Sequence, residues 1–217
     1  MPARRKTRTA PVDHRPRVGR ERRARTRSRI CAAALGVFAE QGVDAPVIDD
    51  FIKAAGVSRG TFYNHFRTTE ELFVATSAWL EDALMRAIQE AIEGLDDPLQ
   101  RLATGVRIWL QRSREDPLFC AFVVRSRYRG HFVEKQLAAD LRDGMRLGKF
   151  QVPGLAVARD LVVGTIREAM SRMMDGRVPR GYTDDVARLI LRGLGVDARI
   201  AGRLLAKALP EVRPQAD

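Results

Sequence analysis

The 217-residue sequence has few cysteines and histidines, two residue types that often carry catalysis or bind metals. Its two cysteines, Cys31 and Cys120, stand far apart in apolar surroundings, and neither has a CxxC partner. Metal-type spacing and a disulfide framework are therefore absent, and we expect two buried structural thiols. The three histidines, His14, His65 and His131, have no evident acid partner for a catalytic triad.

Motifs of the common enzyme classes are missing as well. The sequence contains no Walker loop, no Rossmann glycine pattern and no HExxH segment. An enzyme is therefore the disfavoured alternative, and we expect no catalytic residue, no cofactor and no metal.

Long apolar runs are also absent. No segment approaches the roughly 20 apolar residues that span a bilayer. Residues 30–39 follow an Arg-rich stretch and have the composition of a secretory signal, in which Val37 and Ala39 match the spacing of a cleavage site. The same residues also fit an amphipathic helix, and the following thirty residues need such a helix to pack against. We therefore expect a cytoplasmic protein.

Positive charge is abundant but confined to one end of the chain. Residues 1–30 hold 12 Arg or Lys against Asp13 and Glu21, whereas the remainder carries 26 basic and 25 acidic residues. Such a tail suits contact with nucleic-acid phosphates; the alternative is a solvated arm that only keeps the protein soluble. Residues 1–20 contain three Pro, one Gly and many Arg, and we predict that they are disordered.

After this arm the apolar periodicity is helical nearly everywhere. A first helix carries an apolar face and ends at Gly42, and two short helical segments follow at 47–55 and 58–65. Thr68 and Glu71 form a capping box that opens a helix reaching about residue 93. Later helices open at four cap residues, which are Asp97, Asp116, Thr183 and Asp197. No convincing alternating stretch is present, so we predict an all-α fold with nine to ten helices in total.

Residues 47–66 carry the functional signal. An apolar face ends at Ala55, Gly56 supplies the positive φ of a tight turn, Val57 fills the junction, and Ser58 caps the second helix. Two short helices joined in this way after a preceding helix form a helix-turn-helix. The second helix presents polar side chains suited to a DNA major groove, namely Arg59, Thr61, Tyr63, Asn64 and His65.

Residues 54–66, AAGVSRGTFYNHF, followed by Glu70, Glu71, Leu72 and Phe73, strongly resemble the DNA-binding domain of the TetR/AcrR family of transcriptional regulators. The resemblance covers residues 22–75; beyond it only the helical layout and the Leu194-Gly195-Val196 turn are similar. It implies an N-terminal three-helix helix-turn-helix domain followed by a larger helical domain. The implied organisation is a basic arm at 1–20, a DNA-binding domain at 21–68, an effector-binding and dimerisation domain at 69–210, and a tail at 211–217.

The family resemblance implies a homodimer whose two recognition helices enter successive major grooves of a palindromic operator. Arg59 and Gly60 are expected to lie against base edges, since Arg is the side chain best shaped for two bonds to guanine and Gly allows close approach. The whole set of expected DNA-binding residues is Arg27, Val47, Ser58, Arg59, Gly60, Thr61, Tyr63, Asn64 and His65. Phe62 and Phe66 are predicted to be core rather than to stack on bases. The arm before Arg27 contacts phosphates or, alternatively, enters the minor groove.

One position departs from the family pattern. Where the family usually has a Thr that caps the second helix and touches phosphate, this sequence has Val47. Valine can do neither, so we expect Asp44 or backbone groups to substitute.

The resemblance also implies that the larger domain binds an inducer among its middle helices. A mostly apolar pocket would suit a lipophilic or aromatic effector. The candidate lining residues are Trp109, Phe119, Phe122, Val123, Met145, Met170 and Met173, and the alternative for each is plain core. A basic stretch, Arg125, Arg127, Arg129 and His131, is either a contact for an anionic ligand group or a solvated face.

Dimerisation is expected through the helices at 155–175 and 184–195, as in the family. Candidate contact residues are Gly164, Ala169, Leu189 and Gly193, with Met173 beside them. The resulting prediction is a ligand-responsive, sequence-specific repressor that partners with double-stranded operator DNA, a second copy of itself and a small-molecule effector, but not with a membrane. The alternative is a constitutive or architectural DNA-binding protein without an inducer.

Overall fold

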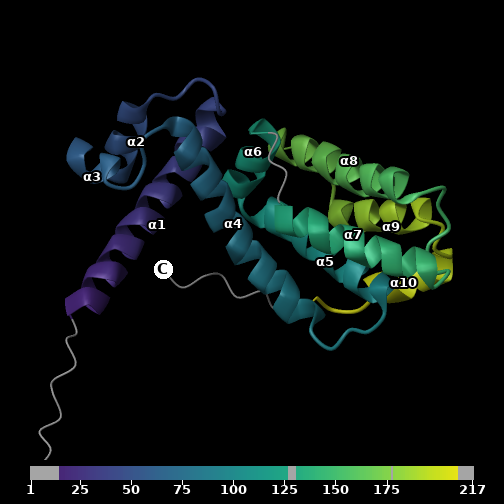
Figure 1. Ribbon diagram of the computed structural model, residues 1–217. Coiled ribbons are helices and arrows are strands. Elements are labelled where there is room, and N and C mark those ends of the chain that lie inside the picture. The colour runs from purple at the N-terminus through teal and green to yellow at the C-terminus, as the bar shows by residue number, and fades with distance from the viewer. Residues whose placement is uncertain (1–14, 127–130, 177, 210–217) are drawn as a thin grey trace, which may run out of the picture.

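The computed structural model describes residues 15–126, 131–176 and 178–209, and these residues form ten helices and no strand (Figure 1). The helices are α1 (Arg15–Gln41), α2 (Ile48–Ala55), α3 (Arg59–Tyr63), α4 (Thr69–Ile92), α5 (Pro98–Glu115), α6 (Pro117–Arg125), α7 (His131–Arg146), α8 (Leu155–Met174), α9 (Tyr182–Gly193) and α10 (Ala198–Leu205). The all-α prediction is confirmed. In the described ranges no helix is long and apolar enough to cross a membrane.

The ten helices fall into a small head and a larger bundle (Figure 1). Helices α1 to α3 form the head, α5 to α10 form the bundle, and α4 runs from one to the other. Helix α6 lies where the bundle meets the head and packs against both α1 and α8. The head and the bundle therefore share two structural connections, α4 and α6.

The apolar core is organised in two clusters. The first fills the head with four completely buried aromatic rings, those of Phe38, Phe51, Phe62 and Phe66, and continues into α4, α6 and α8. The second lies inside the bundle between α5, α7, α8, α9 and α10. Since the head core runs on into α6, a displacement of α6 is felt directly by the packing of the head.

The predicted helix caps are confirmed at four of five positions. The side chains of Thr68, Asp97, Asp116 and Asp197 each accept a hydrogen bond from a backbone N–H of the helix that follows. Thr183 does not begin α9; the helix starts one residue earlier, after Gly181. Gly181 has φ 80° and takes the left-handed conformation that turns the chain into the helix.

The prediction of disorder for residues 1–20 was wrong for residues 15–20, which form the first turns of α1. Pro16 falls in the first turn, where its missing N–H is not needed by the helix. Arginine is a good helix former, so an Arg-rich segment extends a helix readily once its C-terminal half is packed. Residues 1–14 lie outside the described ranges.

Both cysteines are buried free thiols, as predicted. Burial raises the pKa of the Cys31 thiol and raises the pKa of Cys120 to about 11. The Cys120 thiol donates a hydrogen bond to the backbone oxygen of Met170 at 3.4 Å, which ties α6 to α8. Thiols with a raised pKa are poorly nucleophilic, which agrees with a structural role.

Candidate DNA-binding interface and effector cavity

The turn between α2 and α3 has the geometry that its sequence predicts. Gly56 adopts φ 58° and ψ 41°, and its N–H bonds back to the carbonyl of Lys53 at 3.2 Å. The N–H of Val57 reaches the carbonyl of Ile52 at 3.3 Å, so two free carbonyls at the end of α2 are satisfied. Val57 is half-buried against the head core, where it fixes the angle between the two helices.

One face of helix α3 packs on the head, and the opposite face is open to solvent. Its first turn is capped by Ser58, whose hydroxyl oxygen accepts a hydrogen bond from the N–H of Thr61 at 3.1 Å. Phe62 and Phe66 are both 0% exposed, which confirms that they are core. Because this buried face is pinned to the head, the opposite face, with Arg59, Gly60, Tyr63 and Asn64, is presented to solvent.

Arg59 is not free on this face, because its guanidinium pairs with the Asp49 carboxylate on α2. Both side chains are 64% exposed, so the pair is weak in water and can be exchanged for another partner. Tyr63 is 43% exposed and its ring meets the edge of Phe62 at 5.9 Å. Thr61 and His65 are only half-buried rather than fully exposed.

At the start of α2, a backbone group takes the place of the missing Thr cap, which was one of the two expected alternatives, and Asp50 adds a reciprocal contact. The side chain of Val47 is 61% exposed and makes no cap. Instead the N–H of Val47 donates to Oδ2 of Asp50 at 2.9 Å, while the N–H of Asp50 donates to the carbonyl of Val47 at 3.0 Å. The expectation of Asp44 was therefore wrong, because the third residue of the helix reaches back to the residue that precedes it.

A basic concavity lies between the N-terminal half of α1 and the recognition helix α3. Its lining includes Arg22, Arg23 and Thr26 from α1 together with Thr61 and His65. A guanidinium nitrogen of Arg23 donates to the backbone oxygen of Asn64 at 3.2 Å, so the two helices are linked here. Arg side chains gathered in a concavity suit phosphate groups.

The residues that α1 contributes to this concavity were missed in the sequence. Their common position depends on the start of α1 at Arg15, because Arg22 and Thr26 lie one turn apart on a single face of this helix. Arg27, which was expected to touch phosphate, lies over the ring of Phe66 at 4.7 Å. Its stem therefore covers the head core while its charge remains beside the same surface.

His65 occupies the end of the concavity, beside two arginines. Burial lowers its pKa from the ordinary value, and the positive charges of Arg23 and Arg27 lower the pKa further. The surroundings therefore favour the neutral imidazole in the isolated protein. A phosphate placed among these groups would offset the repulsion and favour the protonated ring.

A second concave feature is a cavity of about 110 Å³ in the bundle, which is lined by side chains from α4, α5, α6, α7 and α8 and is partly open to solvent. Three of the seven predicted lining residues are there, Trp109, Val123 and Met170. The sequence missed the contribution of α4, which supplies Met85, Ile88 and Ile92, and that of α7, which supplies polar groups.

The other four predicted lining residues were assigned wrongly, because they do not line the cavity. Phe119 and Phe122 are buried in the core that the bundle shares with the head, and Phe122 packs on Phe73 with ring centroids 5.8 Å apart. Met145 packs on the second core cluster and Met173 on both. Apolar spacing places these side chains inside the protein without deciding which neighbouring helix they meet.

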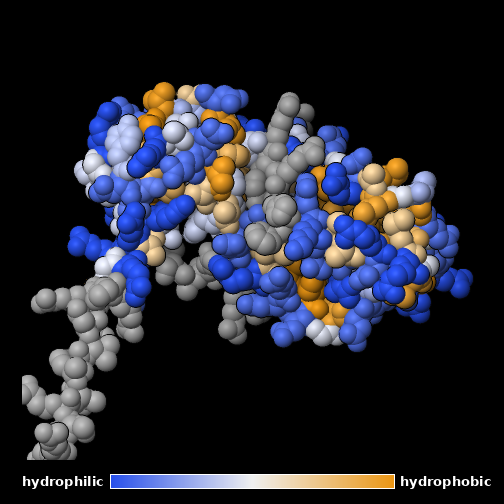
Figure 2. Space-filling view, in the orientation of Figure 1, coloured by the Kyte–Doolittle hydropathy of each residue, from blue (hydrophilic) through white to orange (hydrophobic). Residues whose placement is uncertain are grey.

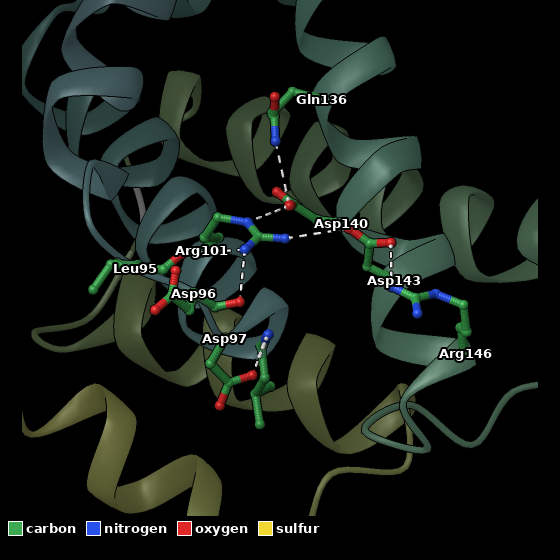
Figure 3. A network of polar contacts seen from close by, with 9 residues as sticks. Leu95, Asp96, Asp97, Arg101, Gln136, Asp140, Asp143 and Arg146 are labelled. Carbon is green, nitrogen blue, oxygen red and sulfur yellow. Dashed lines mark hydrogen bonds and ion pairs between the residues drawn. The ribbon is translucent and has the colours of Figure 1, made fainter.

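The polar end of the cavity is a network centred on Arg101 of α5 (Figure 3). Its Nε donates to Oδ1 of Asp140 at 2.7 Å, and one of its terminal nitrogens donates to the backbone oxygens of Leu95 and Asp96. Asp143 lies 3.5 Å from the other terminal nitrogen. The network joins α7 to the loop before α5, and it places a buried carboxylate, 4% exposed, on the cavity wall.

Two sequence profiles match this chain. A profile described as bacterial regulatory proteins of the TetR family covers residues 30–76, and a profile described as the tetracycline repressor-like C-terminal domain covers residues 97–207. The chain belongs to the TetR family. Its head is the helix-turn-helix DNA-binding domain of this family, and its bundle is the C-terminal domain.

Individual TetR-family proteins are similar over part of this chain. The transcriptional regulator CymR of Pseudomonas putida is 40% identical over 85 residues, which is 38% of this chain and 42% of CymR. The probable acrEF/envCD operon repressor of Escherichia coli strain K12 is 32% identical over 117 residues, 52% of each chain. This chain thus spans about half the length of these curated relatives.

Among solved structures, the regulator RolR in complex with resorcinol is similar to this TetR-family chain over most of its length. The superposition has a TM-score of 0.60 at 26% sequence identity, and it covers 89% of this chain and 99% of RolR.

In this TetR-family protein the predicted dimer residues differ in how far they are exposed to solvent. Leu189 is 67% exposed on α9, and Gly164 and Gly193 are exposed as well. Gly193 also serves packing within the chain, since a Cβ there would lie 3.0 Å from the side chain of Leu161. Ala169 is 2% exposed in the second core, so its assignment as a dimer contact was wrong, because it faces inward on α8.

Proposed function

We propose that this TetR-family protein is a sequence-specific transcriptional repressor, acting in the cytoplasm as a homodimer, that releases a palindromic operator when a small, mainly lipophilic effector enters the bundle. One observation carries the proposal. The recognition helix α3 is capped by Ser58, pinned by Phe62, and presents Arg59 and Gly60 to solvent beside a basic concavity.

The geometry of the head supports DNA recognition. In this proposal Arg59, at the start of α3, exchanges the Asp49 carboxylate for the edge of a guanine base. Arg22, Arg23 and Thr26 surround a site where a phosphate would be met by cations on one side. Base-edge contacts supply sequence choice, and phosphate contacts supply position and affinity.

The cavity supports regulation by a small molecule. It is lined mainly by apolar side chains and lies among the helices that connect to the head, including α4 and α6. The related RolR structure contains resorcinol, which is a small ring compound. A ligand that prefers one arrangement of α4 and α6 changes the relative positions of two heads in a dimer, and so changes operator affinity.

The outer faces of α8 and α9 support dimerisation. Val157 on α8 is 55% exposed and Leu189 on α9 is 67% exposed, and apolar colour is visible over this part of the bundle surface (Figure 2). Gly164 on the same stretch of α8 would allow a second helix to approach closely. Exposed apolar side chains grouped in this way indicate an interface.

A gel-shift titration tests the proposal, with DNA from upstream of the protein's own gene compared with random DNA at several salt concentrations. We expect at least about 10³-fold preference for the operator fragment. The Arg59→Ala variant is expected to lose about 1–3 kcal/mol of operator affinity and to relax sequence choice. Arg203→Ala, which removes an exposed arginine on α10, is the matched control and should bind like wild type.

Equal binding to both fragments with a steep salt dependence would overturn the proposal in favour of a constitutive or architectural DNA-binding protein. Such a protein would draw its affinity from phosphate contacts of the basic N-terminal region rather than from α3.

A further inference from the structure

The bundle cavity has a size that limits its ligand. Its volume of about 110 Å³ is somewhat smaller than the roughly 150 Å³ cavity that holds one benzene molecule in an engineered protein core. Most of its wall is apolar, with Ile88, Val106 and Ile166 among the lining residues. A space of this size accommodates one six-membered ring, and the open side of the cavity leaves room for a small substituent.

The same cavity has a chemically defined polar end. Asp140 is 4% exposed and faces the cavity, and within the described ranges both of its hydrogen bonds, from Arg101 and from Gln136 at 3.3 Å, end on Oδ1 (Figure 3). The Arg101 guanidinium is directed at Asp140, Asp143 and two backbone oxygens. The polar group that this end offers to a ligand is therefore the Oδ2 acceptor of a buried carboxylate.

The charges on the cavity wall argue for a neutral ligand. Arg101 and Arg167 are balanced by Glu134 and Asp140. A carboxylate ligand would place a second negative charge beside Asp140, and a ligand without a donor would leave the Asp140 oxygen unsatisfied after burial. A neutral hydroxyl that donates one hydrogen bond avoids both costs.

Another part of the wall suits an aromatic ring. The indole N–H of Trp109 donates to the thioether sulfur of Met170 at 3.2 Å, and both residues line the cavity. Sulfur and indole surfaces make favourable contacts with aromatic rings. Because the N–H···S bond is weak, a ligand that enters the cavity can change the surroundings of the indole. The fluorescence of Trp109 therefore reports ligand binding.

We propose that this cavity binds a neutral single-ring phenol, whose hydroxyl donates to the Asp140 carboxylate and whose ring lies against Trp109 and Met170. The inference rests on the proposed function only in treating this cavity as the effector site. The binding of the phenol itself is a separate property of the cavity.

The test is a fluorescence titration of the full-length Trp79→Phe protein, which leaves Trp109 as the reporter. The probes are phenol, anisole, toluene and benzoate, which share one ring and differ in the donor and the charge. Phenol is expected to bind roughly tenfold or more tightly than each of the others, as befits one hydrogen bond to a charged acceptor. Toluene or anisole binding as tightly as phenol would overturn the inference without any variant being made.

Two variants locate the hydroxyl. Asp140→Asn is expected to reduce the preference for phenol over toluene to less than about threefold, because the acceptor loses its charge. Asp143→Asn removes the other carboxylate beside Arg101 without touching the cavity wall, and it should keep the wild-type preference. Equal effects of the two substitutions would contradict the placement of the hydroxyl at Asp140.

A gel shift with phenol separates this inference from the proposed function. Binding of phenol with the expected preference, without release of the operator, would support the ligand class and contradict effector control through this cavity. Release of the operator by ligands that show no preference for a donor would support the regulation and overturn the ligand class.

Discussion

The guanidinium of Arg125, in the last turn of α6, donates a hydrogen bond to the carbonyl oxygen of Ala39, in the last turn of α1, at 2.8 Å. The same nitrogen also bonds to the carbonyl of Glu40. Carbonyls at a helix C-terminus lack partners within the helix and carry the negative end of its dipole. Since Val123 of α6 lines the cavity, one short helix touches both the proposed effector site and the DNA-binding head.

Arg125→Ala is expected to weaken the communication between the cavity and the head. Without these hydrogen bonds α6 can shift while α1 stays in place, so several-fold more effector should be needed to release the operator. Affinity for the effector in the absence of DNA should remain unchanged. The measurement is a pair of titrations, one following ligand binding and one following operator release.

The matched control is Arg114→Ala, which removes an exposed arginine from the last turn of α5. It should release the operator at the wild-type effector concentration. Identical behaviour of the two variants would mean that the Arg125 contact carries no coupling.

Asp49→Asn is expected to raise operator affinity about two- to fivefold. The substitution frees Arg59 for a base edge and removes a negative charge from the DNA-facing surface, while an exposed ion pair contributes less than about 1 kcal/mol to stability. Gel-shift titrations at fixed salt would measure the gain. Asp82→Asn, at an exposed position of α4, is the comparison and should leave affinity unchanged, so a similar gain there would exclude a specific effect of the Asp49 pair.

His65 makes operator binding depend on pH. Its pKa is lowered in the isolated protein, so the folded state holds the proton less well than the unfolded chain. Its contribution to stability is therefore present above about pH 6.5, the ordinary pKa of histidine, and is lost as pH falls through the lowered pKa of the folded state. A bound phosphate reverses this preference. Operator affinity should therefore increase as pH falls from 8 to 6, and DNA should protect the protein against the loss of stability.

The check is the operator dissociation constant measured at several pH values for wild type and for His65→Gln. The variant should show a flatter dependence on pH. His131→Gln, at the start of α7, should retain the wild-type slope. A wild-type slope in His65→Gln would show that other groups govern the pH response.

Leu189→Glu is expected to convert the proposed dimer to a monomer. The substitution places a charge at the most exposed large apolar side chain of α9, which would be desolvated in a helix-to-helix interface. Sedimentation of the variant at micromolar concentration would show the monomer, and its operator affinity would fall because only one half-site is engaged. Leu118→Glu, at an exposed position of α6, is the control, and dissociation by both or by neither would place the interface elsewhere.

The sequence determined the recognition unit because the signals there are local. Gly56 requires a particular backbone conformation, Ser58 lies three residues from the N–H that it caps, and Phe62 and Phe66 share one face by spacing alone. Such features are set by residues within one or two helical turns of each other. They could therefore be assigned to roles before any helix was placed in space.

Only the tertiary structure decided which apolar residues form the cavity and which form core. Periodicity indicates the buried face of a helix, but not the neighbouring helix that covers it. Phe122 therefore lies in the core shared with the head, whereas Ile88 of α4 lines the cavity. The pairing of Arg101 with Asp140, 39 residues away, likewise depends on the packing of α5 against α7. Contacts between distant segments are selected by the packing of the whole chain, and no local pattern encodes them.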